Sequence, residues 1–140
     1  MKIQELQKCI ANSINGIENL VQGCCKAFAE DTRSVYDEAE HFVSTGGVAI
    51  VVVTPQLDRS GGNTEYGIPV EGEVLIRIIE RVPLAKHKNN LRGLDAAEII
   101  MHTLDGDGLE FKSMNQTSSP YRETITTTVT FNCAFVLTNN

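Results

Sequence analysis

The sequence predicts an α+β domain, with a mostly antiparallel sheet of four or more strands and helices packed mainly on one face. Within residues 123–137, every second position from Ile125 to Leu137 is apolar except Thr127, and this is the period of a strand with one buried face. Residues 48–53 are continuously apolar and β-branched, as in a strand that is buried on both faces. Helical spacing of apolar residues near the N-terminus and over 94–104 predicts the main helices.

The size and charge of the chain narrow the possible classes of protein. A chain of 140 residues has the length of one domain, which we divide into a helical N-terminal part (1–45) and a sheet with one long helix (46–140). The net charge of −6 argues against nucleic acid as a specific partner, because duplex binding requires a basic face. No signal-peptide core or membrane-spanning run is present in the sequence, so we expect no membrane partner.

The N-terminal part predicts two helices. Apolar residues step by three or four positions from Ile3 to Val21, with a kink or break expected at Asn15–Gly16 and an end at Gly23. Residues 24–33 are compatible with a longer helix or with a short irregular strand. A short helix follows over 35–43, and the sequence Thr45-Gly46-Gly47 ends it.

The middle of the chain predicts a hairpin of two strands. The strand at 48–53 stops at Pro55, and residues 56–72 form a polar loop without an element of its own. The next strand, 73–82, pairs back onto the first. One of its faces is apolar, whereas the other mixes leucine and isoleucine with arginine. Such a mixed face predicts a contact with a second helix or with another subunit.

The C-terminal part predicts a helix and a second hairpin. The helix runs over 94–104, with Gly106 at its C-terminal cap, and a strand over 109–114 is followed by a polar turn at 115–120. The last strand pairs back from there, and it places Phe131 and Cys133 in the core and Thr128 outside it. Because this strand is long, we expect part of its edge to be unpaired and available to another chain.

The sequence contains no motif for catalysis or for a cofactor. Residues 105–116 lack three of the defining positions of a calcium-binding EF-hand loop. The three histidines are not spaced as a helical metal-binding pair, and no phosphate-binding loop or nucleophile elbow occurs. The four cysteines form no C-x-x-C pair and predict reduced thiols. We therefore predict no enzymatic activity, no metal and no cofactor.

Candidate contact residues fall in three places. A mobile loop is expected over 58–67, the mixed face belongs to the strand at 73–82, and a basic cluster lies in the connection that follows it. The residues that we expect to contact another subunit or a partner are Asp58, Arg59, Tyr66, Leu75, Arg77, Ile79, Lys86, Lys88 and Arg92.

The order of these elements resembles the small tail-terminator, or tail-completion, proteins of long-tailed phages, of the lambda-like and Mu-like kinds. The similar segments are 36–43 followed by 46–53, the strand at 73–80, the helix at 94–104 and the final strand. The resemblance implies a homo-oligomeric ring, usually a hexamer, that ends growth of the tail tube and meets the head connector. It also implies synthesis in the bacterial cytoplasm, a place in the tail of the virion, and tail-tube and connector proteins as partners.

Two other classes stay open at this point. One is a different head–tail joining protein of a phage or mobile element with a similar sheet. The other is a small α+β ligand-binding domain or enzyme, against which stands the lack of a paired acid and base or of an activated nucleophile in the sequence.

Overall fold

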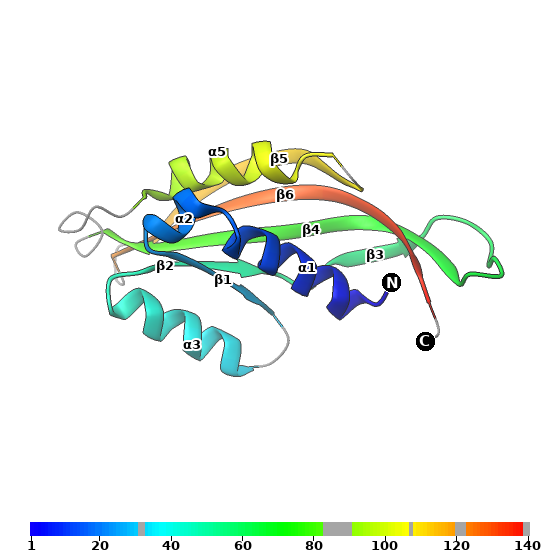
Figure 1. The fold of residues 1–140 in the computed structure, drawn as a ribbon, viewed down its shortest axis with the longest axis horizontal. Coiled ribbons are helices and arrows are strands. Elements are labelled where there is room, and N and C mark those ends of the chain that lie inside the picture. The colour runs from blue at the N-terminus through cyan, green and yellow to red at the C-terminus, as the bar shows by residue number, and fades with distance from the viewer. Residues whose placement is uncertain (31–32, 83–90, 107, 120–122, 139–140) are drawn as a thin grey trace.

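The computed structural model describes residues 1–30, 33–82, 91–106, 108–119 and 123–138. The strands form one sheet, and helices lie on both of its faces (Figure 1). The helices are α1 (Ile3–Asn15), α2 (Glu18–Gln22), α3 (Arg33–Ser44) and α5 (Gly93–Leu104). The strands are β1 (Cys25–Ala29), β2 (Val48–Val52), β3 (Gln56–Arg59), β4 (Ile68–Arg81), β5 (Leu109–Ser119) and β6 (Thr124–Leu137).

The sheet has the strand order β1-β2-β4-β6-β5, and β3 pairs with the first part of β4. Strands β1 and β2 are parallel and are joined by α3, whereas every other pair is antiparallel. The mostly antiparallel α+β fold is therefore confirmed, and so is the hairpin-like pairing of β2 with β4. Figure 1 shows β4 and β6 running side by side through the length of the molecule.

The main core lies between the sheet and the helices α1, α2 and α5. Alternate residues of the central strands pack there against Ile14, Leu20 and Ile100, all of which are fully buried. The strand residues in this core are Cys25, Ala27, Val48, Ile50, Val52, Val74, Ile76, Ile78, Val129 and Phe131. A smaller cluster on the opposite face holds α3 against Ala49, Val51 and Ile79. Three helices thus cover one face, and α3 covers part of the other.

The N-terminal helix breaks where the sequence predicts. Helix α1 ends at Asn15, and α2 starts again at Glu18. Residues 25–29 form β1, which decides between the two alternatives for this segment. Helix α3 ends before Gly46, which has a left-handed φ of 99°. Helix α5 ends at Leu104, as predicted, with Asp105 at the cap position and Gly106 in the following turn.

Two predicted loops are wrong, because both are largely strand. Residues 56–72 contain β3 and the start of β4, which form a hairpin of their own. Gly72 permits this pairing, because a Cβ atom there would lie 1.8 Å from the carbonyl oxygen of Gln56. Residues 115–119 belong to β5, and their polar side chains are explained by an edge position that is exposed on both faces.

The prediction that part of the last strand's edge is unpaired is also wrong. All of β6 pairs with β4, from Ile68 opposite Leu137 to Arg81 opposite Thr124. Its other edge pairs with β5 along the whole length of that strand. The sequence suggests a two-strand hairpin with an overhang, but the longer β4 and β5 leave β6 in the interior of the sheet. The exposed edge therefore belongs to β5.

The face assignment of the last strand leads to a first prediction. Phe131 has no exposed surface, whereas Thr128 is only half-buried on the opposite face. We expect Phe131→Ala to lower the free energy of unfolding by about 3–5 kcal/mol, the range for truncating a large buried aromatic side chain. Thr128→Ala serves as the control and should change it by less than about 1 kcal/mol. Denaturant titration measures both values, and the reverse ranking would mean that the two faces have been exchanged.

Candidate assembly surface

The mixed face of β4 is the face that α3 covers only in part. Ile79 packs against the α3 cluster, so the protein's own helix covers this predicted contact residue. Leu75 and Arg77 lie further along the same face and are half-buried. A recess between α3 and the sheet continues from Ile79 to Arg81 and Thr126. The second helix that the mixed face predicts is thus α3, and the uncovered remainder is a surface open to a partner.

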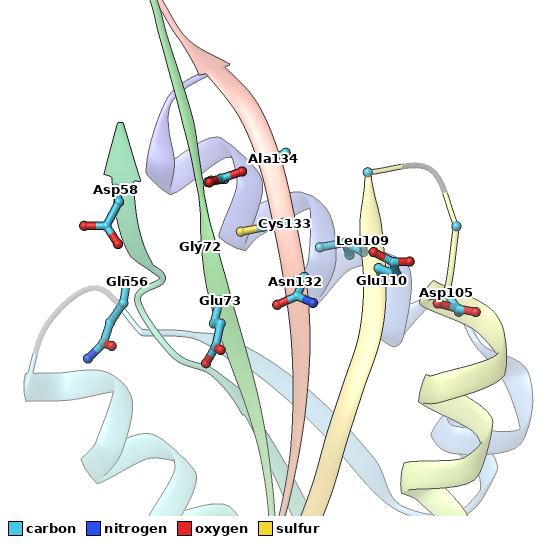
Figure 2. Close-up of a pocket in the computed structure, with 13 residues that line it drawn as sticks. Gln56, Asp58, Gly72, Glu73, Asp105, Leu109, Glu110, Asn132, Cys133 and Ala134 are labelled. Carbon is cyan, nitrogen blue, oxygen red and sulfur yellow. The ribbon is translucent and has the colours of Figure 1, made fainter. Parts of the chain in front are cut away.

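At the other end of this face the sheet forms an open, negatively charged concavity of about 1010 Å³ (Figure 2). The carboxylates come from three strands, β3, β4 and β5, and from the turn that follows α5: Asp58, Glu71, Glu73, Asp105 and Glu110. The register explains their proximity, because Gln56 pairs with Glu73, and Glu73 with Asn132, in adjacent strands. Glu73 forms an ion pair with Lys112. The sequence signal for this surface was the alternation of Glu71 and Glu73, which places both on one face of β4.

The predicted loop at 58–67 is the end of the β3–β4 hairpin. Asp58 and Arg59 belong to β3, and the Arg59 side chain donates a hydrogen bond to Asn63 Oδ1 at 2.6 Å. Tyr66 is 73% exposed. Figure 1 shows this hairpin reaching past both chain termini at one end of the molecule. The hairpin therefore presents an aromatic side chain at the far end of the protein, where a neighbouring molecule has access to it.

Arg92 is placed by an interaction within the chain. Its Nε donates to Oε2 of Glu80 at 3.0 Å, and the N–H of Gly93 donates to the same oxygen at 3.1 Å. The Glu80 carboxylate is almost fully buried at the first turn of α5, where a negative charge is stabilised by the helix dipole. Hydrogen bonding to Glu80, together with its charge, raises the pKa of the Arg92 guanidinium. Lys86 and Lys88 lie outside the described residues.

Two of the four cysteines, Cys25 and Cys133, are buried as small apolar side chains. Cys133 is buried on the inner face of β6, as predicted, and burial raises the pKa of its thiol. Burial, followed by the charges of Cys24 and Glu80, raises the pKa of Cys25 to about 12. Both buried thiols are therefore protonated at neutral pH. Cys9 and Cys24 are exposed and unpaired.

Two further findings concern other classes of site. Among the residues that the structure describes, no group of three or more histidine, cysteine or acidic side chains is placed to hold a metal ion. No helix in the described ranges is long and apolar enough to cross a membrane.

Comparisons with known proteins find matches among solved structures alone. No protein-family model matches the chain, and no curated protein matches it. Among solved structures, a chain described as "Virion of native gene transfer agent (GTA) particle" superposes with a TM-score of 0.59 over 92% of each chain, at 12% sequence identity. The protein shares its fold with a chain of a virion particle. At this identity the match establishes the arrangement of helices and strands, and it covers nearly all of both chains.

The buried carboxylate of Glu80 gives a second prediction. Glu80→Ala removes the acceptor from the Gly93 N–H inside the core, and we expect it to lower the free energy of unfolding by about 1–3 kcal/mol. The control is Glu73→Ala on the same strand, whose ion pair with Lys112 is exposed; it should cost less than about 1 kcal/mol. Thermal and denaturant unfolding compare the two variants. Equal losses of stability would contradict a structural role for the Glu80 contact.

Proposed function

We propose that the protein is a structural component of a phage or tail-like particle, a ring-forming tail terminator that ends growth of the tail tube and meets the head connector. The fold likeness to a chain of a gene transfer agent virion, over 92% of both chains, carries this proposal. The tail-terminator resemblance of the sequence points in the same direction. In this proposal the protein has no enzymatic activity and binds neither a metal nor a cofactor.

The surface of the protein supports an assembling role. One end carries the acidic concavity, and the exposed Tyr66 marks the projecting hairpin. Leu75 and Arg77 form the part of the mixed face that α3 leaves open. Contacts between different surfaces of identical subunits close into a ring when the rotation between subunits permits it. A head–tail joining protein with the same fold is the second candidate, since the virion match favours it equally.

The test of the proposed function is assembly of the purified protein. We expect its mass, measured by sedimentation velocity and native mass spectrometry, to increase with concentration to a closed oligomer. We also expect it to bind one end of purified tail tubes, seen by electron microscopy of the gold-labelled protein. Binding to isolated head connectors without binding to tubes would favour the joining protein. A protein that stays monomeric and binds no particle component would refute the structural role.

The β3–β4 hairpin provides a further prediction. Replacing residues 61–66 by Asn-Gly leaves a four-residue loop between Ser60 and Pro69, which lie opposite each other, so the register of β3 and β4 is kept. We expect the variant to unfold with nearly unchanged free energy, while assembly needs about tenfold more protein. Tyr66→Ser in the full-length hairpin is the matched control for the aromatic contact alone. If the shortened protein were unfolded, the hairpin end would be part of the core rather than a contact segment.

A further inference from the structure

The hydrogen-bonding direction of each residue in β5 follows from one contact further along the sheet. The N–H of Val82 donates to the carbonyl oxygen of Glu123 at 2.9 Å. Bonded and non-bonded pairs alternate in an antiparallel ladder, so the odd-numbered residues of β6 bond to β4 and the even-numbered ones bond to β5. The β5 residues opposite those even positions are Ser113, Asn115, Thr117 and Ser119. The residues between them, Met114, Gln116 and Ser118, therefore direct their backbone groups away from the sheet.

The first part of the β5 edge is closed by the protein itself. The N–H of Phe111 donates to Oδ1 of Asp105 at 2.9 Å, and Gly106 and Leu109 exchange two backbone hydrogen bonds of 2.7 Å. Among the described residues, no such partner is found for the outward groups of residues 114–118. This open segment contains no charged residue and no proline, which are the usual means of blocking an edge.

The opposite edge of the sheet is formed by β1 and β3, and in the described part of the chain only β1 is covered there. The side chain of Asn15 occupies the edge of β1: its Nδ2 donates to the carbonyl of Ala27 at 3.1 Å, and its Oδ1 accepts from the Ala27 N–H at 2.8 Å. Strand β3 has no such cover in the part of the chain that the structure describes. Ser60 donates to the Pro69 carbonyl, so by the same alternation Leu57 and Arg59 of β3 point outward.

The directions of the strands make these two open edges compatible. Strands β3, β4, β6 and β5 are each antiparallel to the next, so β3 and β5 run in opposite directions. A second copy whose strands run in the same directions as those of the first copy therefore places its β3 antiparallel to β5 of the first copy. Pairing of β5 with another β5 would instead require a two-fold axis and would not continue into a ring.

We propose that the open segment of β5, residues 114–118, pairs with β3 of a second copy, so that neighbouring sheets join head to tail. This inference rests on the proposed ring and names the contact that closes it. Leu57 pairs directly with Gly72 of β4. Met114 pairs with a β6 residue that in turn pairs with Ile76 of β4, four residues further along than Gly72. Such an offset between the two margins is what the stagger of strands in a closed sheet requires.

Disulfide trapping tests this contact directly. The non-bonded positions of the new ladder are Asp58 on one copy and Asn115 or Thr117 on the other; these pairs have Cα atoms about 4.5 Å apart, within disulfide range. The exposed cysteines are first removed as Cys9→Ser and Cys24→Ser. We expect Asp58→Cys mixed with Asn115→Cys or Thr117→Cys to give covalent dimers on mild oxidation, and either variant alone to give none. Glu38→Cys, exposed on α3, is the control for random collision.

The outcomes separate this inference from the proposed function. Covalent dimers from Thr117→Cys alone would mean that β5 pairs with β5, which overturns the head-to-tail contact. A wild-type protein that forms rings while no mixture crosslinks would refute the contact and leave the ring intact. A wild-type protein that never assembles would refute both. As a second measurement, Ser118→Pro removes one outward N–H and should raise the concentration for half-assembly about tenfold relative to Ser118→Ala, without loss of the folded monomer.

Discussion

The structure depends on the full-length pairing of β4 with β6. Each strand has 14 residues, and the register continues without a bulge from one end to the other. This pairing places alternate residues of both strands on the same face, so Val74 and Phe131 meet in the core and Arg77 and Thr128 meet outside it. It also carries Glu80 to the start of α5, where the carboxylate binds the first helical N–H. The other strands add to the two margins of this central pair.

Polar side chains form hydrogen bonds to backbone groups that the packing of the apolar core does not satisfy. The core holds α1 against the sheet through Ile10 and Ile14, but it does not satisfy the backbone at the ends of the strands. The buried amide of Gln7 donates to the carbonyl groups of Glu30 and Val52, at the ends of β1 and β2. Asn15 performs a similar function on β1, and Asp105 on β5. Buried backbone groups are costly when they lack a partner, so these few residues determine where the sheet ends.

The sequence predicts the fold where burial and side-chain periodicity agree. The continuous apolar run of β2 and the alternation in β6 each identify a strand, and Gly16 identifies the break after α1. Periodicity identifies the first half of β5 but fails for its second half, residues 115–119, because an edge strand exposed on both faces has no apolar face to reveal it. It also fails for β3, whose pairing depends on the close approach that Gly72 permits. The acidic concavity and the open β5 segment are long-range features, since they arise from the register of strands that are distant in the sequence.

The Asn15 side chain that covers the edge of β1 has a consequence for folding during synthesis. A chain folds from its N-terminus during synthesis, and Asn15 leaves the ribosome before β1 does. The cap is thus already present when the edge that it protects appears. Strand β5 emerges after β4, and β6, which lies between them in the sheet, emerges after both. Until β6 emerges, the edges of β4 and β5 that it occupies have no partner, so the sheet that carries the open β5 edge is complete only once β6 has been made.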